Sequence, residues 1–446
     1  MAPRVAIVGA GPAGAFTAAA LLRARGDVQI DLIERLPTPW GLLRGGVAPD
    51  HQEIKRLDDT FERQTLQRGC RFLGNVEVGT DLSHGDLMRH YTAVIYATGA
   101  QTDKSLGIPG EDLPGSRPAT EFVAWYNGHP DYRDRTFDLS VKRAVVIGNG
   151  NVAADVTRVL TRDPDALAQT DIADHALAAL RDSRIEEVVV LGRRGPAQAA
   201  FTSAELRELG NLDGVDLLVE PFELDPVSEQ WLHEEGTFTA RKNVQLLREF
   251  AARGPRGGGR RIVLRFLRSP VAIRGDGRVA AIDIQPNEIV RSDDGAIRAR
   301  AADDAVETIE CGLVPRSVGY RAVPLPDVPF DERAYVLPND RGRVLGADGE
   351  PVPGVYTVGW IKRGPTGILG TNKRDAQETV RCLVEDLSVL PPAPDEGGID
   401  ARLPAGVVTV DGWRAIDAHE RERGHAAGRP RIKLASRDEL LGLAAS

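Results

Sequence analysis

The sequence contains few cysteines, and that shortage narrows what the protein can be. Three of 446 residues are cysteine (Cys70, Cys311 and Cys382), and none belongs to a CxxC pair. A dithiol redox centre and an iron–sulfur cluster bound by four cysteines are therefore excluded, and we expect no metal centre. The low cysteine content favours the reducing cytoplasm as the compartment.

Long apolar runs and a surplus of positive charge are also missing. No stretch of about 18 uncharged apolar residues occurs, so no membrane-spanning helix is expected. The N-terminus leads directly into a strand pattern rather than into a signal peptide. The 56 Lys and Arg residues against 65 Asp and Glu give a net charge of −9, which argues against nucleic acid as a partner. Only 7 of those 56 cations are lysine, so arginine is common throughout the chain.

A glycine-rich turn near the N-terminus has the surroundings of a dinucleotide-binding motif. An apolar run at 4–8 predicts a strand, Gly9-Ala10-Gly11-Pro12-Ala13-Gly14 matches GxGxxG, and a helix to about residue 25 follows. The next predicted strand, 28–33, ends at Glu34. The glycines permit a close backbone approach, the helix N-terminus faces a pyrophosphate, and the carboxylate accepts ribose hydroxyls. A glycine turn in an unrelated α/β unit is disfavoured, because strand, helix and acid all fit.

The same pattern recurs with the opposite charge at the ribose position. A predicted strand at 143–147 leads into Gly148-Asn149-Gly150-Asn151-Val152-Ala153 and a helix to about residue 160. The paired strand, 187–191, is followed by Gly192 and then Arg193 and Arg194 instead of an acid. Two guanidinium groups suit a 2′-phosphate, so this motif favours NADP over NAD. The alternative is a solvated surface in an Arg-rich protein.

Later segments complete the first nucleotide domain and define the expected organisation. Residues 93–99 and 355–360 predict strands, and a glycine turn at 364–370 precedes a helix at about 371–387. The fold class is therefore α/β, with two Rossmann-like dinucleotide-binding domains, the second inserted into the first. We assign 1–101 and 321–390 to the FAD-binding domain, 102–320 to the NADP-binding domain, and 391–446 to a linker and a C-terminal tail packed on the FAD domain.

Several segments together resemble the adrenodoxin-reductase type of ferredoxin–NADP⁺ reductase, above all its actinobacterial members. They are PWGLLR at 39–44 followed by GVAPDH at 46–51, GNGNVA at 148–153, GRRGP at 192–196 and VGWIKRGPTG at 358–367. The resemblance implies FAD at the first glycine turn and NADPH at the second. With the motif glycines, the matching FAD contacts are Gly9, Gly11, Ala13, Gly14, Glu34, Leu42, Val76, Trp360, Gly367, Ile368 and Leu369. The matching NADP contacts are Lys104, Asn149, Gly150, Asn151, Val152, Arg193, Arg194, Glu205 and Gly367. Lys104 stands where relatives often have arginine.

The resemblance also implies a reaction that needs no nucleophilic side chain. A hydride passes from NADPH to FAD, and single electrons pass from FAD to a ferredoxin-type iron–sulfur protein. His51 and Asp155 match a water-linked pair near the flavin, which we expect to handle protons. The alternatives are a hydrogen-bonded loop histidine and an acid in the first turn of a helix. Glu205 could likewise be first-turn charge after Thr202 and Ser203. Trp360 is expected at a strand end beside the flavin.

A cluster of cations suggests where an acidic partner docks. Residues 241–268 contain nine Lys and Arg residues and one Glu. Ferredoxins are generally acidic, so Arg241, Lys242 and Arg248 are candidates for ferredoxin docking. The alternative is solvated arginine around a glycine-rich hairpin tip at 257–259.

Four rival functions share parts of this pattern. An NADPH diaphorase or quinone reductase would differ only in its electron acceptor. An electron-transfer subunit of a larger complex, like the small subunit of glutamate synthase, needs cluster-binding cysteines that this chain lacks. A non-catalytic NADP-binding scaffold would bind no flavin. Flavin monooxygenases share the glycine turns but not the PWGLLR and GPTG segments.

Overall fold

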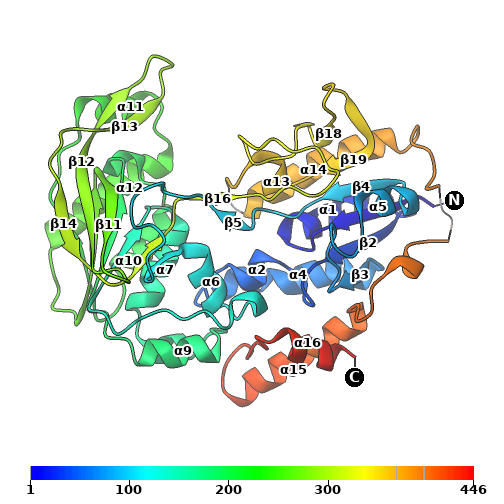
Figure 1. Ribbon diagram of the computed structural model, residues 1–446, viewed down its shortest axis with the longest axis horizontal. Coiled ribbons are helices and arrows are strands. Elements are labelled where there is room, and N and C mark those ends of the chain that lie inside the picture. The colour runs from blue at the N-terminus through cyan, green and yellow to red at the C-terminus, as the bar shows by residue number, and fades with distance from the viewer. Residues whose placement is uncertain (1, 368, 395–396, 446) are drawn as a thin grey trace. The chain divides into compact units, whose positions relative to one another are not determined.

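The computed structural model describes residues 2–367, 369–394 and 397–445, which form two compact units (Figure 1). Unit 1 comprises Met1–Lys104, Asn127–Asp131 and Gly319–Ser446, and unit 2 comprises Ser105–Tyr126 and Tyr132–Val318. The chain therefore leaves unit 1 and later returns to it. The predicted α/β class with two nucleotide-binding folds is confirmed, because each unit is built on its own largely parallel sheet.

Unit 1 contains a seven-stranded sheet. Its strands lie in the order β17 (Asn339–Asp340), β18 (Arg343–Leu345), β19 (Pro351–Thr357), β4 (Ala93–Tyr96), β1 (Arg4–Val8), β2 (Gln29–Glu34) and β3 (Arg71–Gly74). The five strands from β19 to β3 are parallel. In β1, Val5 and Ile7 enter one hydrophobic cluster, and Ala6 and Val8 enter another. Both faces of the central strand are covered, which explains its uninterrupted apolar sequence.

Helices cover the two faces of this sheet. On one face, α1 (Pro12–Ala24) and α14 (Leu369–Asp386) lie side by side, and α15 (Val410–Ala426) and α16 (Arg437–Ala444) join the same cluster through Trp413 and Leu440. The other face packs against α5 (His84–His90) and α13 (Trp360–Arg363). Three short helices follow β2: α2 (Leu42–Gly45), α3 (Gln52–Lys55) and α4 (Leu57–Gln64).

Unit 2 combines a parallel and an antiparallel sheet. The parallel sheet has the order β6 (Ser116–Pro118), β15 (Val314–Arg316), β7 (Arg143–Ile147), β8 (Glu187–Gly192), β10 (Arg260–Phe266) and β9 (Val215–Val219). The antiparallel sheet contains β11 (Arg268–Arg274), β12 (Ala281–Arg291), β13 (Ile297–Ala301) and β14 (Glu307–Glu310). The helices that bear on the site are α7 (Asn151–Thr161), α10 (Ser203–Gly210), α11 (Pro226–Glu234) and α12 (Phe238–Arg253).

Two local expectations are wrong. Residues 257–259 are no hairpin tip: they connect α12 to β10, which runs parallel to both β8 and β9. Trp360 does not end a strand, because β19 stops at Thr357 and Gly359, with φ +81°, starts the turn into α13. None of the helices in the described ranges is long and apolar enough to cross a bilayer.

Candidate functional site

In unit 1 the first glycine turn joins β1 to α1, and its glycines differ in the space that surrounds them. A Cβ on Gly9, which has φ +104°, would lie 2.6 Å from the Ala97 carbonyl oxygen, and a Cβ on Gly14 would lie 2.0 Å from that of Gly9. These two glycines are required by the protein backbone itself. A Cβ on Gly11 would meet only the Gly41 Cα, at 3.8 Å, so Gly11 leaves room for a ligand.

The start of α1 suits an anion. Gly11 is its N-cap without a side-chain hydrogen bond, Pro12 opens the helix, and the first turn contains no acid. The N–H groups of this turn are the donors that a pyrophosphate uses. Ala13 is buried close to Gly359, since a Cβ on Gly359 would lie 2.6 Å from the Ala13 Cβ. The cradle therefore fits the phosphates of a dinucleotide.

Glu34 ends β2 beside this turn. Its two carboxylate oxygens accept hydrogen bonds from the Ala10 N–H at 2.9 Å and the Leu36 N–H at 3.1 Å. Burial raises the pKa of Glu34, although these N–H groups and Arg35 oppose the shift. The Val76 N–H donates to the Glu34 carbonyl at 3.0 Å, so Val76 lies next to it. Each carboxylate oxygen keeps acceptor capacity for a ribose hydroxyl.

The remaining FAD candidates lie on three short segments of unit 1. Leu42 starts α2 and is 40% exposed. Trp360 starts α13, and its ring centroid lies 5.1 Å from that of Tyr320. Gly367 has φ +84° and Leu369 begins α14, whereas Ile368 lies outside the described residues.

The second glycine turn, in unit 2, joins β7 to α7 and contains an unsatisfied donor. The Asn149 Nδ2 is buried and has no hydrogen-bond partner among the described residues. A Cβ on Gly192 would lie 2.5 Å from this nitrogen, so Gly192 makes room for the amide. Gly150 caps α7 without a side-chain hydrogen bond, and a Cβ there would meet only Ala200 Cβ, at 4.0 Å. An orphaned donor at an open helix N-terminus fits a bound nucleotide.

Arg193 and Arg194 follow β8 as the sequence predicts. Arg193 is exposed and Arg194 half-buried, and neither forms an ion pair within the described part of the chain. Burial and, after it, repulsion from Arg193 lower the pKa of Arg194. A 2′-phosphate would supply the counter-ion that these two adjacent guanidinium groups lack.

A buried arginine that sequence analysis missed ties the neighbouring acids together. Arg158 on α7 is 0% exposed and pairs with Asp155 at 2.6 Å and with Glu205 at 3.0 Å. Asp155 is not in the first turn of α7, which begins at Asn151 and has no acid there. Glu205 does lie in the first turn of α10, where Thr202 accepts its N–H at 3.3 Å. The i,i+3 spacing of Asp155 and Arg158 was the available signal.

Other candidates link these elements or stand apart from them. The Asn151 Oδ1 accepts the Thr202 N–H at 2.8 Å, and Val152 is half-buried against the core of unit 2. The Lys104 side chain is exposed, and the Lys104 backbone N–H donates to the Gly319 carbonyl at 2.9 Å. His51 is the half-buried N-cap of α3 in unit 1, whereas Asp155 belongs to unit 2, so their pairing stays a prediction.

The three docking candidates lie on α12. Arg241 donates to the Leu232 and His233 carbonyls at 3.2 and 3.3 Å, and Lys242 to Gln245 at 3.0 Å. Arg248 lies 5.9 Å from the centroid of Phe222. Phe238, at the start of the same helix, is 82% exposed. Most other cations of the cluster bind protein carbonyls or acids: Arg253, Arg256, Arg260, Arg261 and Arg265.

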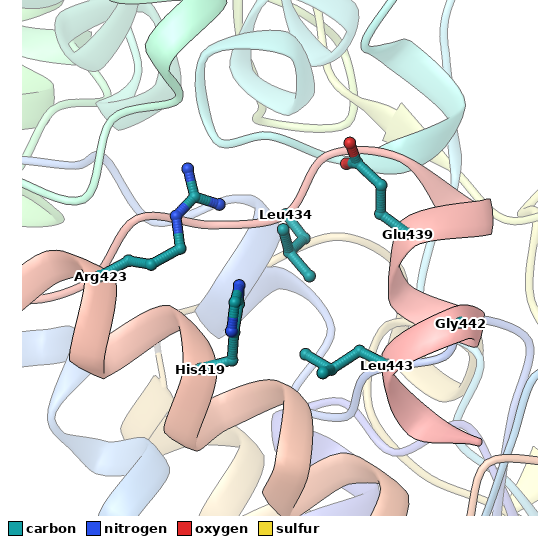
Figure 2. A pocket seen from close by; sticks show the side chains of 6 residues that line it. All are labelled: His419, Arg423, Leu434, Glu439, Gly442 and Leu443. Carbon is teal, nitrogen blue, oxygen red and sulfur yellow. The ribbon is translucent and has the colours of Figure 1, made fainter. Parts of the chain in front are cut away.

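A shallow pocket lies elsewhere in unit 1, between α15 and α16 (Figure 2). It has a volume of about 490 Å³ and is lined by His419, Arg423, Leu434, Glu439, Gly442 and Leu443. None of the predicted site residues lines it.

Comparison with known proteins decides the family. NADPH-ferredoxin reductase FprA of Mycobacterium leprae is 50% identical over 452 residues, which cover 98% of this chain and 97% of that protein. The chain belongs to the NADPH–ferredoxin reductase family. The mitochondrial NADPH:adrenodoxin oxidoreductase of Salvelinus fontinalis is 41% identical over 463 residues and covers 99% of this chain and 91% of its own. The resemblance to adrenodoxin-type reductases is thus confirmed.

Structural comparison agrees with this family. A solved structure of Mycobacterium tuberculosis FprA in complex with NADPH is 48% identical, covers 100% of both chains and gives a TM-score of 0.93. Residues 3–190 also match the model of the pyridine nucleotide-disulphide oxidoreductases. Cys70, Cys311 and Cys382 are all buried and unbridged, and burial raises the pKa of the Cys70 and Cys311 thiols to about 12.

Proposed function

We propose that this protein is an FAD-dependent reductase that takes a hydride from NADPH and passes single electrons to a ferredoxin-type iron–sulfur protein. One observation carries the proposal. Each unit presents an uncapped helix N-terminus at a glycine turn, and the strand beside it ends in Glu34 in unit 1 but is followed by Arg193 and Arg194 in unit 2. A carboxylate suits a free ribose, and guanidinium groups suit a 2′-phosphate.

The chain's own residues have binding and orienting duties. FAD, when bound, supplies the chemistry that accepts two electrons together and releases them singly. Glu34 accepts ribose hydroxyls, and the N–H groups of α1 bind the pyrophosphate. Leu42, Val76, Trp360 and Leu369 would contact the bound FAD. Arg193 and Arg194 bind the 2′-phosphate, and Asn149 donates its unused N–H to the nicotinamide nucleotide.

His51 and Asp155 are the proposed proton-handling residues. The histidine holds or releases a proton near the flavin, and the carboxylate orients it through water. Asp155 also forms an ion pair with the buried Arg158, at 2.6 Å. The proton is exchanged at the His51 imidazole, because the Arg158 guanidinium does not release one.

Ferredoxin docking is proposed at Arg241, Lys242 and Arg248. These side chains lie on one helix whose start exposes Phe238, and an exposed aromatic side chain on the same helix as three cations suits an acidic protein. A three-site reversal to glutamate should slow ferredoxin reduction at low salt and leave NADPH-driven flavin reduction unchanged. Reversal of Arg133, Arg184 and Arg207, three exposed cations of unit 2 outside α12, is the matched control. We propose a cytoplasmic location, which the buried, unbridged cysteines suit.

The decisive experiment is an anaerobic titration of the purified protein with NADPH and then with NADH, followed by visible absorption. Flavin that bleaches at much lower NADPH than NADH supports the proposal. A yellow protein that bleaches equally with both would contradict the 2′-phosphate assignment. A colourless protein that cannot be reconstituted with FAD would overturn the reductase and favour an NADP-binding scaffold. Reduction of quinone but of no ferredoxin would favour a diaphorase.

A further inference from the structure

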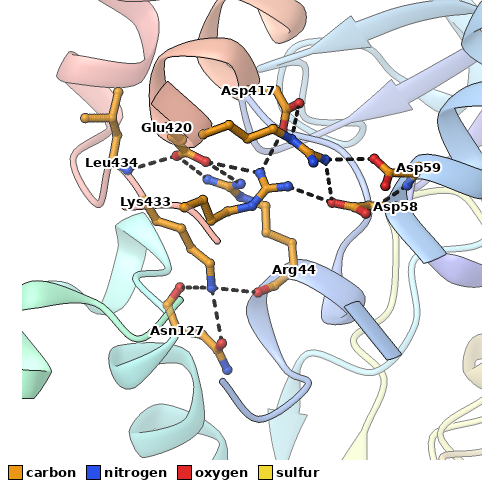
Figure 3. Close-up of polar contacts among 10 residues, drawn as sticks. Arg44, Asp58, Asp59, Asn127, Asp417, Glu420, Lys433 and Leu434 are labelled. Carbon is orange, nitrogen blue, oxygen red and sulfur yellow. Dashed lines mark hydrogen bonds and ion pairs between the residues drawn. The ribbon is translucent and has the colours of Figure 1, made fainter. Parts of the chain in front are cut away.

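Helix α15, in the C-terminal segment, contains a wholly buried carboxylate. The Glu420 side chain is 0% exposed. Its oxygens accept hydrogen bonds from both terminal nitrogens of Arg44, at 2.6 and 2.8 Å, and from the Leu434 N–H at 2.8 Å (Figure 3). Burial opposes its ionisation, but Arg44 and Arg431 outweigh burial and lower the pKa of Glu420. Arg44 and Glu420 thus form a bidentate ion pair, and Arg431 is a second cationic partner of Glu420, at 3.4 Å.

Arg44 lies on α2, which cannot stabilise itself. A helix of four residues is far below the length of about 12–15 residues at which helices persist alone in water. Yet α2 must be held firmly, because Gly41, directly before it, touches the first glycine turn. A Cβ on Gly41 would lie 2.9 Å from the Gly11 Cα, and the Trp40 N–H donates to the Ala10 carbonyl at 2.9 Å. The position of α2 therefore sets the wall beside Gly11.

A lysine from the same C-terminal segment binds Arg44 through its backbone carbonyl. The Lys433 Nζ, on a side chain that is almost fully buried, donates to the Arg44 carbonyl at 3.2 Å and to the Asn127 carbonyl at 3.0 Å (Figure 3). The Asn127 Oδ1 also accepts a hydrogen bond from Lys55 at 2.7 Å. Lys55 is the last residue of α3, the helix that His51 caps. Glu420 and Lys433 thus restrain the two helices that flank the loop from Gly46 to His51.

The geometry points to Glu420 as a positioning residue of the flavin site. Through Arg44 it fixes α2, and α2 keeps Leu42 and Gly41 in place against the glycine turn. The assignment rests on the proposed FAD site, but the mechanical part does not: the restraint on residues 40–48 exists whether or not flavin binds there.

Two variants and one control test the assignment. Glu420→Gln removes the charge with almost no change in shape, and Arg44→Lys keeps the charge but loses the two-pronged contact. Asp386→Asn is the control, because Asp386 also pairs with an arginine in unit 1, Arg343, at 2.7 and 2.8 Å, but belongs to the far end of α14. Hydrogen–deuterium exchange of residues 40–48 is measured on the apoprotein, and the FAD dissociation constant by flavin fluorescence.

We expect faster exchange at 40–48 in both α2 variants but not in the control, with FAD bound roughly 2- to 30-fold more weakly. Unchanged exchange at 40–48 would refute the restraint. Faster exchange with an unchanged FAD dissociation constant would refute the positioning role and leave Glu420 purely structural. If wild-type protein binds no FAD, the proposed function fails together with the flavin part, while the exchange result still reports the restraint. If Glu420→Gln does not fold, Arg44→Lys decides both readouts.

Discussion

Removal of Arg194 should abolish most of the proposed preference for NADPH over NADH. A hydrogen bond between a guanidinium and a phosphate contributes about 1.5–3 kcal/mol, so Arg194→Gln should lower kcat/KM for NADPH about 10- to 150-fold. Arg193 is exposed, and its contact is screened by water and salt. Arg193→Gln should therefore lower kcat/KM for NADPH only about 2- to 5-fold, as expected of a contact that contributes about 0.5–1 kcal/mol.

The same structure predicts an opposite effect on stability. Burial and the neighbouring Arg193 lower the pKa of Arg194, so its charged form is less favourable in the folded protein than in the unfolded chain. Replacement by neutral glutamine removes that cost, and the ligand-free variant should unfold at a higher temperature than wild type. If Arg194→Gln lowers the affinity for NADPH and raises the Tm, Arg194 is a ligand contact and not a residue that stabilises the fold.

The assay is anaerobic stopped-flow reduction of the flavin by each nucleotide, with Arg207→Gln on α10 as a control outside the proposed contact. The rate of flavin reduction by NADH should change little in the Arg194 variant, because NADH has no 2′-phosphate for Arg194 to bind. A parallel fall in NADPH and NADH efficiency would refute the 2′-phosphate assignment. A fall in Tm would show instead that Arg194 supports the fold.

The remaining predictions concern glycine, protonation and the ribose contact. Gly150→Ala has room in the protein and should raise KM for NADPH at unchanged Tm, whereas Gly14→Ala, whose Cβ would lie 2.0 Å from the Gly9 oxygen, should lower Tm and FAD content together. Burial lowers the pKa of His129 to about 4, so only the unfolded chain binds its proton between about pH 6.5 and 4. The free energy of unfolding should then decrease as the pH is lowered from about 6.5 to 4, and His129→Gln should flatten that decrease in urea titrations. Glu34→Gln should weaken FAD binding in fluorescence titrations with little effect on KM for NADPH.

The parts that sequence analysis predicted are those whose chemistry is local. Strand, glycine turn, helix and terminal charge follow one another within about 30 residues, and backbone sterics alone require Gly9 and Gly14. Arg158 was also within reach, one helical turn after Asp155, but the abundance of arginine hid it. Trp360 was misplaced because a positive φ at Gly359 turns the chain two residues after the strand ends.

The contacts that escaped prediction join residues far apart in the chain. Arg44 and Glu420 are 376 residues apart, and nothing in either local sequence indicates the other. Asn127 is a similar example: it lies between two stretches of unit 2, yet it belongs to unit 1, where its oxygens bind Lys55 and Lys433. Local motifs can specify which groups meet a nucleotide, because covalent spacing determines them. Tertiary restraint on short helices such as α2 depends on where a distant segment packs. For that reason sequence analysis predicted that the C-terminal tail packs on the FAD domain, but not that it holds α2 beside the proposed flavin site.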